Sequence, residues 1–492
     1  MTTVRTVIGI LGLYFLSQSA QAEKSAPAPV SAKHAERIEL IEAGLRPTYG
    51  VRDGEKEQWT LAERMRHYDV PGVSIAVAID GKLVWAKAYG VLDKNSGKEV
   101  DSDTLFQAAS LSKPIASLAG LALVQDGLLS LDKPANEFLT SWQIPDNEFT
   151  KQEPVTIRHL MSHRGGTTIH GFKGYETGAD LPSLPQILDG VAPANTLPVI
   201  VNQLPGKEYR YSGGGFTILQ LAIEDAIGRS FADVVEGRIF YPADMTRSNF
   251  RYPVNDPNAA TGHDGKGSLS MAGRDLVYPE LAAAGMWTTP SELVTLGSLV
   301  ADARNTGNLI LDTALARQLV PNDAEMPGLG FGLNDAGDGL TFVHNGHNPG
   351  FSARWINYAD GRASVAVLTN SDSGGNLIRE IFSGIGHVYG WKQDAYEVRD
   401  TIPLSEAELR DIAGSYAFGQ DDKQPVATIS VIDGELWIDG ILVERSRLHA
   451  LSKSAYFVTK GLNFETERSA SGQVIAISVE GEIRLVRLLS KD

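Results

Sequence analysis

The sequence of 492 residues contains no cysteine, which excludes disulfide bonds and a lipid-modified cysteine. It has no excess of basic side chains either. The formal net charge is −16, without long acidic runs, which argues against nucleic acid or an anionic membrane surface as a partner. An H-E-x-x-H zinc motif, a G-x-S-x-G turn and a repeat of fixed period are all missing. The sequence therefore predicts a globular protein of more than one domain that relies on its hydrophobic core, with no cofactor and no metal site.

The first 22 residues carry a single charged side chain, Arg5. It is followed by an apolar run over Val7–Leu16 and by Ala20-Gln21-Ala22, which together are typical of a signal peptide cleaved after Ala22. The run is too short to span a bilayer comfortably, so an uncleaved anchor is the less favoured alternative. We expect residues 1–22 to be removed on export to the periplasm or the medium, leaving no membrane span. Residues 23–35 are expected to form a flexible spacer.

Residues 36–395 combine helix and strand patterns in separate blocks. Asp80-Gly81 separates two β-rich runs and predicts a hairpin. The other expected elements are a helical stretch at 36–67, a mostly helical region at about 115–300, strands at 341–343, 351–358 and 363–369, and a helix at about 375–389. Strands at both ends with helices between them indicate an α+β fold, in which one antiparallel sheet is covered by helices.

A second domain is expected beyond a boundary near residues 395–404. Ser405 and Glu408 form a possible capping box that begins a short helix. After it the pattern changes to short strands separated by Asp-Gly turns. Residues 400–492 are therefore predicted to form a separate small β-barrel or meander. For Tyr456 and Trp437, packing in its core is favoured over lining a ligand pocket.

The most informative motif is Ser-Leu-Ser-Lys, which places Ser110 and Lys113 one turn apart at the head of an apolar helical segment. Residues three apart lie on one face of a helix, so Lys113 can reach the Ser110 hydroxyl. Serine becomes a good nucleophile only when a base takes its proton. Lysine is such a base when burial lowers its pKa from about 10.4 and leaves it neutral. The spacing resembles the S-x-x-K motif of penicillin-recognising serine hydrolases.

Two alternatives weaken this motif when it is taken by itself. A serine at a helix start is often only a cap. The same spacing also recurs at Ser130 and Lys133, between Gly127 and Pro134, where we interpret it as a solvated turn that ends the helix. The interpretation of Ser110 as a nucleophile therefore depends on partners elsewhere in the chain.

Tyr211 is the first such partner. It follows a Pro-Gly turn and precedes three glycines beginning at Gly213, which let the backbone bend sharply or approach another segment. A tyrosine beside a cationic lysine would have its phenolate favoured, which suits proton transfer. Taken alone, Tyr211 is better explained as a half-buried aromatic side chain at a strand end.

The second partner is the segment His-Asn-Gly-His-Asn-Pro-Gly-Phe at 344–351, which follows a strand signal. Gly346 keeps side chains out of a substrate's way, and backbone N–H groups at such an edge can bind an oxyanion together with the N–H of Ser110. Alternatively, His344 and His347 are surface histidines or a chance metal pair. Histidines at i and i+3 without an acidic partner are weak evidence for a metal.

In order, these segments resemble the S-x-x-K, Y-x-N and K-T-G or H-x-G motifs of the class C β-lactamase/esterase/D-aminopeptidase group of serine hydrolases. The resemblance covers about residues 36–390. The segment at 71–82 is similar to the family's opening hairpin, 155–163 to its TIRHLLTH segment, and 285–293 to its GGLYSTPSDL segment. A β-lactamase/transpeptidase-like fold is therefore implied. His159 and His163 match the family too, and we interpret both as structural.

The resemblance also implies roles by position. Ser110 is the expected nucleophile, Lys113 the base that activates it, and Tyr211 a shared base and proton relay. His344 would stand where lactamases place the lysine of K-T-G and would stabilise charge or relay protons. The N–H groups of Ser110 and His347 would form the oxyanion hole.

Two glycines complete the expected substrate-binding set, Gly346 and Gly213. Gly213 replaces the asparagine of Y-x-N, so the side-chain amide with which relatives hold an acyl-amide group is missing. His344 replaces a lysine, which removes a fixed charge for a substrate carboxylate. A charge-assisted hydrogen bond contributes about 1.5–3 kcal/mol, so these departures favour an esterase or peptidase over an efficient β-lactamase.

The leading hypothesis is an exported serine hydrolase that cleaves a small-molecule ester, peptide or β-lactam through an acyl-enzyme on Ser110. A D-amino-acid peptidase or peptidoglycan carboxypeptidase is the alternative within enzymes. A penicillin-binding or sensor protein that is acylated without turnover is the alternative from another class. A class A β-lactamase is disfavoured, because Ser371-Asp372-Ser373, the nearest match to S-D-N, lies after the H-x-G segment.

Overall fold

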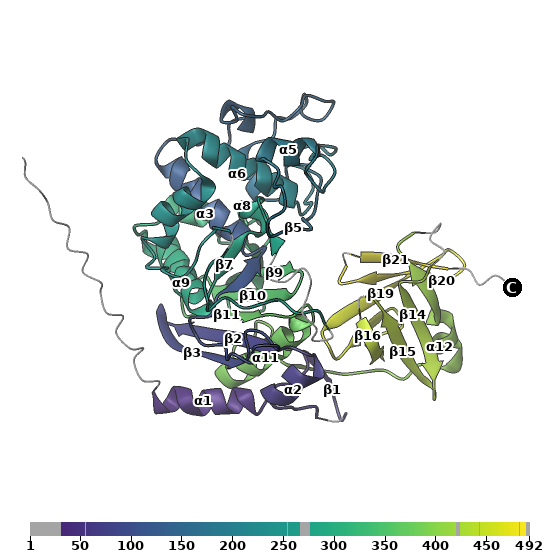
Figure 1. Cartoon of the computed structure of the whole chain (residues 1–492). Helices are drawn as coiled ribbons and strands as arrows, with labels where there is room; N and C mark the ends of the chain where they lie inside the picture. Colours follow the sequence, from purple (N-terminus) through teal and green to yellow (C-terminus); the bar gives the residue numbers. More distant parts are fainter. Residues whose placement is uncertain are drawn as a thin grey trace, which may run out of the picture.

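The computed structural model describes residues 31–54, 56–252, 254–265, 276–419, 424–441, 443–481 and 483–488. The predicted signal peptide and residues 23–30 of the expected spacer lie outside these ranges. Within them, no helix combines the length and apolarity that crossing a bilayer requires. The chain forms a sheet with helices on both sides, and a β-rich part beside it (Figure 1).

The central sheet joins strands from distant parts of the sequence, as predicted. Its order is β3-β2-β11-β10-β9-β8, and all neighbours are antiparallel. The strands are β2 (Gly72–Ile79), β3 (Lys82–Gly90), β8 (Gly332–Asp335), β9 (Leu340–Asn348), β10 (Phe351–Tyr358) and β11 (Ala363–Thr369). The predicted hairpin β2–β3 is confirmed: Asp80 and Gly81 both have positive φ, as a two-residue turn of this type requires.

Three helices cover one face of this sheet: α1 (Ala32–Glu42), α2 (Leu61–His67) and α11 (Gly374–Tyr389) (Figure 1). Their apolar side chains pack with those of β2 and β11 in a single buried cluster. Buried ion-pair contacts also join α2 to α11. Arg64 Nε and Nη2 donate to the two carboxylate oxygens of Glu380 at 2.6 and 2.5 Å, and the Tyr68 hydroxyl donates to the same carboxylate at 2.7 Å.

The N-terminal expectations need two corrections. The predicted helical stretch at 36–67 is two helices, separated by β1 (Tyr49–Val51), which pairs with a strand more than 340 residues later in the chain. The expected spacer also ends earlier than residue 35. Helix α1 already begins at Ala32, because the Ser31 hydroxyl accepts the N–H of His34 and caps its first turn.

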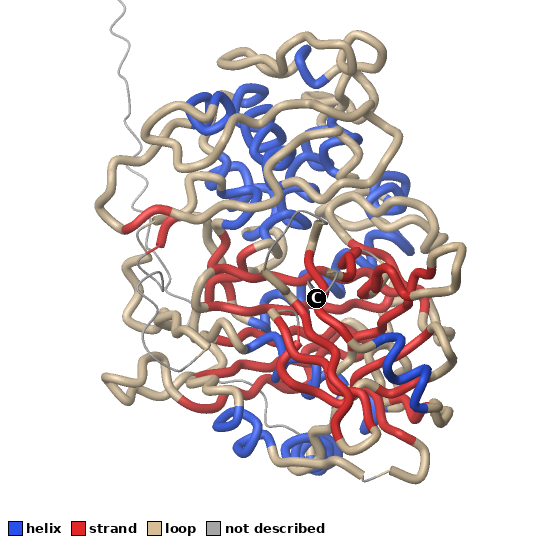
Figure 2. The backbone as a smooth tube through the Cα atoms, turned by 90° about the vertical axis from the view of Figure 1, so that its right-hand side faces the viewer, coloured by secondary structure: helices blue, strands red, loops and turns tan. Residues whose placement is uncertain are grey.

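The other face of the sheet carries the main helical part, in which the helices gather above the strands (Figure 2). Its helices are α3 (Ser112–Gln125), α4 (Ile157–Met161), α5 (Leu184–Asp189), α6 (Gly213–Ile227), α7 (Phe231–Val235), α8 (Leu281–Ala284), α9 (Pro290–Thr306) and α10 (Thr313–Leu319), with the short helices η1 (Ala135–Glu137) and η2 (Glu236–Phe240). Two small antiparallel pairs connect them: β4 (Phe106–Ala109) with β7 (Met286–Thr288), and β5 (Tyr175–Glu176) with β6 (Leu276–Val277).

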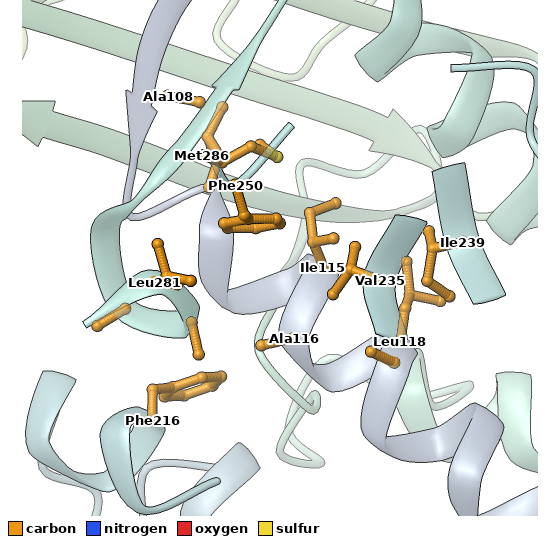
Figure 3. Packing of buried hydrophobic residues seen from close by; sticks show 14 of the residues in the cluster. Ala108, Ile115, Ala116, Leu118, Phe216, Val235, Ile239, Phe250, Leu281 and Met286 are labelled. Carbon is orange, nitrogen blue, oxygen red and sulfur yellow. The ribbon is translucent and has the colours of Figure 1, made fainter. Parts of the chain in front are cut away.

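Helix α3 lies at the centre of this part and is buried on nearly every side. Figure 3 shows Ile115 and Leu118 of α3 packed against Val235 and Ile239, with Phe250 beside the start of the helix. This explains why the sequence of α3 is apolar on all faces rather than on one stripe. A side chain that enters this environment from the first turn of α3 is removed from water.

The C-terminal part is a nine-stranded antiparallel sheet in the order β16-β15-β14-β13-β21-β20-β19-β18-β17. The strands are β13 (Gly414–Ala417), β14 (Ala427–Ile432), β15 (Glu435–Gly440), β16 (Val443–Arg447), β17 (His449–Ala450), β18 (Ala455–Val458), β19 (Leu462–Arg468), β20 (Val474–Val479) and β21 (Ile483–Arg487). The two ends of the sheet, β16 and β17, follow each other in the chain, so the sheet curls into a nearly closed barrel, as predicted.

The capping box predicted at Ser405 and Glu408 is confirmed and begins α12 (Glu406–Ile412). Tyr456 packs in the barrel core, as favoured from the sequence. The barrel contacts the rest of the chain through β1, which pairs in parallel with β12 (Glu397–Arg399). The Tyr49 N–H donates to Thr459 O at 3.0 Å, which ties β1 to the barrel as well.

The buried Arg64–Glu380 pair makes a stability prediction. Arg64→Met leaves the Glu380 carboxylate buried without its cation, so we expect the free energy of unfolding to fall by about 3–5 kcal/mol. Replacing the whole set, in Arg64→Met/Tyr68→Phe/Glu380→Leu, is expected to lose much less, because no unpaired charge remains. Denaturant unfolding of purified variants measures both. Equal losses in the two variants would show that the buried charge is not the cause.

Candidate active site

Ser110 lies on a tight turn between β4 and α3. Ala109, the residue before it, has a φ of 50°, an uncommon conformation for a residue with a side chain. Ser112 holds this turn: its hydroxyl donates to Ala109 O at 2.6 Å and accepts the N–H of Met286 at 3.0 Å. The first position of α3 has no side-chain cap, so the alternative that Ser110 serves as a helix cap is excluded.

Lys113 reaches Ser110 as the spacing predicts. Its Nζ lies 2.9 Å from Ser110 Oγ and 2.8 Å from Ala283 O. The side chain is 1% exposed, and its Nζ lies 4.8 Å from the ring centre of Tyr211. Among the described residues, no carboxylate forms an ion pair with it. Burial alone lowers the pKa of Lys113 to about 7, so a large neutral fraction exists at physiological pH.

Tyr211 completes a group of three with Ser110 and Lys113. Its hydroxyl forms a hydrogen bond with Ser110, which favours the phenolate, but burial is the larger effect and raises the pKa of Tyr211 well above 10. The expectation that a cationic lysine favours the phenolate is therefore wrong. The lysine is itself desolvated, and Tyr211 is a neutral phenol that can donate a proton.

Strand β9 passes directly over the nucleophile turn, and Gly346 makes this possible. A Cβ atom on Gly346 would lie 2.2 Å from Ala108 O, so any side chain here would push the strand away. Two residues further on, Asn348 Nδ2 donates to Gln107 Oε1 at 2.8 Å and to Ala284 O at 3.2 Å. The structure thus brings the H-x-G segment and the nucleophile turn together, as predicted.

The backbone of His347 faces the open edge of β9. Strand β8 pairs with β9 only as far as Val343, so no strand covers residues 344–348 on that side. Asn348 and Phe351 flank a two-residue turn and form a hydrogen-bonded pair with each other. Because such pairs alternate with non-bonded ones, the N–H of His347 points to the open edge, as an oxyanion donor must. Its side chain is 61% exposed, with Nε2 4.0 Å from Asp372 Oδ1.

His344 is a neutral group in this structure. Its Nδ1 lies 2.6 Å from Asn345 O and must carry the proton, because a carbonyl oxygen only accepts. Burial, helped by the charge of Lys113, lowers the pKa of His344 to about 3. The expected role in stabilising a negative charge is therefore not supported. Its unprotonated Nε2 leaves the proton-relay role open, and the ring centre lies 6.1 Å from that of Tyr211. His344 and His347 lie on opposite faces of β9, which argues against a metal pair.

Gly213 offers no group that could bind substrate, which corrects the expectation that it belongs to the substrate-binding set. It is the first residue of α6, and its N–H donates to His170 O at 3.0 Å. A Cβ atom there would lie 3.0 Å from Phe172 Cε2 and 3.1 Å from His170 O. The loop at 170–172 therefore fills the space into which a side chain at position 213 would extend.

Sequence reasoning missed the loop at 168–172 and underrated His163. Ile169 has a φ of 64°, an outlier for a β-branched residue, and its carbonyl accepts the N–H of Gly214 at 3.0 Å. The His170 ring lies 4.8 Å from Tyr211, and the His163 ring stacks on Tyr211 at 4.3 Å. Nothing in the sequence marks the loop, because it reaches the site only through tertiary contacts.

The remaining sequence candidates lie away from the site. His159 caps its own helix α4, where its Nδ1 accepts the N–H of Thr156 at 3.3 Å, so it is structural as interpreted. Lys133, in the second copy of the S-x-x-K spacing, lies 3.7 Å from Glu137 with both side chains exposed. That copy is the solvated turn that the flanking glycine and proline indicate. In the described part of the chain, no group of three or more acidic or histidine side chains is arranged to hold a metal ion.

The chain is similar to several known proteins. Esterase EstB of Burkholderia gladioli is 28% identical over 249 residues, which are 48% of this chain and 62% of the esterase, so the chain spans less than two thirds of that relative. Penicillin-binding protein 4* of Bacillus subtilis (strain 168) is 22% identical over 360 residues, 70% of this chain and 78% of that protein. The solved structure of D-amino acid amidase from Ochrobactrum anthropi SV3 with L-phenylalanine matches with a TM-score of 0.56 at 21% identity. It covers 73% of this chain and 100% of the amidase, and at this identity shows a shared fold.

A family model described as Beta-lactamase matches residues 59–381, which is more than half of the chain and includes every segment that meets at Ser110. The chain therefore belongs to the β-lactamase family of serine hydrolases.

Proposed function

We propose that this protein is an exported serine hydrolase that cleaves ester or amide bonds through an acyl-enzyme on Ser110, with small esters as the preferred substrates. The observation that carries the proposal is the 2.9 Å contact between Ser110 Oγ and the buried Lys113 Nζ, together with the lowered pKa of that amine. The export part of the proposal rests on the signal-peptide pattern of residues 1–22.

The acylation step uses three side chains and two backbone groups. Lys113 Nζ takes the proton of Ser110 as Oγ forms its bond to the substrate carbonyl carbon. The negative charge that develops on the carbonyl oxygen lies between the N–H groups of Ser110 and His347. When the bond to the leaving group breaks, Tyr211 donates a proton to it, and Lys113 returns a proton to Tyr211.

Deacylation follows the same path in reverse, with water in place of the leaving group. The water loses a proton to the Tyr211/Lys113 pair as its oxygen bonds to the acyl carbon, and the pair returns a proton to Ser110 Oγ as the acid leaves. The raised pKa of Tyr211 suits this relay, since the residue stays a phenol between steps.

The preference for esters is supported by the lack of charge around the nucleophile. His344 is neutral where lactamases carry a lysine, and Gly213 offers neither a side-chain amide nor a free N–H. A substrate carboxylate would therefore lose its solvation without gaining a cationic partner from these two positions. An uncharged acyl group has no such penalty.

The function can be tested with a substrate panel. We expect short-chain nitrophenyl esters to be turned over faster than a D-Ala-D-Ala peptide, a D-amino acid amide or nitrocefin. Ser110→Ala should lower kcat by at least about a thousand-fold, because the nucleophile is lost. Mass spectrometry after fluorophosphonate treatment should locate the label on Ser110. A burst of acylation without turnover would favour the sensor alternative, and faster turnover of the D-peptides would favour the peptidase.

The lowered pKa of Lys113 predicts the pH dependence. Because the neutral amine is the base, kcat/KM should be low at acidic pH, rise as pH increases through about 7, and level off above it. His344 stays neutral over this range and adds no limb near 6.5. Steady-state kinetics with an uncharged ester, whose own ionisation does not change, measures the profile.

Glu280 supplies the control for this profile, because burial raises its pKa to about 7 as well. Both of its carboxylate oxygens are buried, and among the described residues neither has a side-chain partner, so Glu280→Gln removes the titration with little change in shape. The limb should persist in this variant. Its disappearance would assign the limb to Glu280 and contradict the role of Lys113.

The close approach at Gly346 predicts a third effect. Gly346→Ala places a methyl group against Ala108 O and displaces β9 from Ser110, so we expect kcat to fall by about a hundred-fold. Gly375→Ala, in the first turn of α11, places its Cβ more than 4 Å from any described neighbour, so it is the matched control and should keep wild-type rates. Wild-type acylation in Gly346→Ala would refute the geometry that we assign to the oxyanion site.

A further inference from the structure

His163 follows the last turn of α4, and its ring packs against that of Tyr211, the proposed proton relay of Ser110. It has a φ of 57°, a conformation that histidine, asparagine and aspartate adopt more readily than most residues with side chains. It is buried, with 7% of its surface exposed, and its ring lies 5.1 Å from that of Phe216. The acyl-transfer steps described above make no use of it.

Three contacts join His163 to Tyr211 and to both of its neighbours. The carbonyl oxygen of His163 accepts the N–H of Arg210 at 2.8 Å. Its Nδ1 accepts the N–H of Ser212 at 3.1 Å. Between these two hydrogen bonds, the imidazole stacks on the Tyr211 ring, with centres 4.3 Å apart and planes 28° apart. The backbone on each side of Tyr211 and the ring itself are thus held by one residue.

The protonation state of His163 follows from these contacts. Because Nδ1 accepts a backbone N–H, the ring proton is on Nε2, which is buried and has no hydrogen-bond partner in the described part of the chain. Burial and the nearby Lys113 lower the pKa of His163 well below its usual value, so the ring stays neutral. A neutral ring at this place packs against the relay without adding a charge that would oppose protonation of Lys113 during the reaction.

We propose that His163 is the positioning residue for Tyr211: its Nδ1 and ring fix the phenol at the hydrogen-bonding position next to Ser110. It touches no substrate and acts only through the tyrosine. The inference rests on the proposed acyl-transfer function, in which Tyr211 protonates the leaving group. Loss of this positioning should therefore slow acylation by esters whose leaving group needs the proton and spare acylation by those whose leaving group does not.

Leaving groups separate these two kinds of reaction. A nitrophenyl ester releases a stable phenolate and needs little protonation, whereas an alkyl ester releases a strongly basic alkoxide that must be protonated. In His163→Phe the ring remains but Ser212 N–H loses its acceptor. Both esters form the same acyl-enzyme, so the comparison uses kcat/KM, which reports acylation alone. We expect kcat/KM for an alkyl ester of the same acyl group to fall by about thirty-fold, with kcat/KM for the nitrophenyl ester changed by less than about threefold.

His163→Asn is the rescue variant. Asparagine tolerates the positive φ and places Oδ1 where Nδ1 accepts the Ser212 N–H, so only the stacked ring is lost. The kcat/KM for the alkyl ester should fall by only about fivefold. His159→Gln, on helix α4 just before His163, is the matched control: glutamine keeps the cap that His159 provides, and kcat/KM for both esters should match the wild type. Rates are referred to the number of sites that a fluorophosphonate titrates, so misfolded protein does not count.

A double variant with Tyr211→Phe tests whether His163 acts through Tyr211. If His163 acts through Tyr211, then His163→Phe should add no further leaving-group penalty in the Tyr211→Phe background. The proposal is overturned if the ratio of alkyl to nitrophenyl rates is unchanged in every His163 variant that titrates, or if the penalties of the two substitutions add. Where His163→Phe yields no folded protein, the ratio in His163→Asn decides. A wild-type enzyme that fails to hydrolyse either ester would instead refute the proposed function.

Discussion

The proposed chemistry of this protein depends on the exclusion of water from one lysine, Lys113. A buried ammonium is strongly disfavoured, so Lys113 lowers its pKa to about 7 instead of remaining charged. The surroundings that cause this are the packed core around α3 and the rings of Tyr211 and Phe216. The stability of the helical part and the basicity of its central amine therefore have the same origin. A loosely packed core around α3 would admit water, and Lys113 would be protonated and unable to activate Ser110.

The rest of the site keeps this environment uncharged. His163 accepts one backbone hydrogen bond at Nδ1, and His344 donates one from Nδ1, so these bonds fix which nitrogen carries the proton in each neutral ring. Burial lowers the pKa of both histidines. Burial also raises the pKa of Tyr211, which therefore remains a phenol. The motifs that this chain resembles have a lysine and an asparagine where the chain has His344 and Gly213. Desolvation thus links the proposed mechanism to the proposed substrate preference, because a site with no fixed charge suits an acyl group with none.

Close approach of backbones is the second constraint, and glycine makes it possible at one decisive point. At Gly346 the strand that offers oxyanion donors lies against the turn that carries Ser110, with no room for a Cβ atom. At Gly213 the approach to the loop at 170–172 is less close, and the N–H is already bonded to His170 O. The same residue type therefore lets a strand approach the nucleophile in one place and offers no binding group in the other. Spacing in the sequence does not separate these two outcomes.

Local patterns were sufficient where a few neighbouring residues decide the structure. A three-residue spacing on a helix brought Lys113 to Ser110, Asp80-Gly81 set the hairpin, and Ser405 with Glu408 began α12. Strands at both ends of residues 36–395 with helices between them indicated the α+β fold, and the order of the motifs along the chain indicated the family. What the sequence could not decide was each pKa and the use of each polar group. These depend on the total burial and on contacts with segments that are distant in the sequence, such as the rings of His163 and His170 against Tyr211. Desolvation and hydrogen bonding act through space rather than along the chain, so only the tertiary structure showed that Tyr211 stays protonated, that His344 is neutral and that Gly213 has no donor to offer.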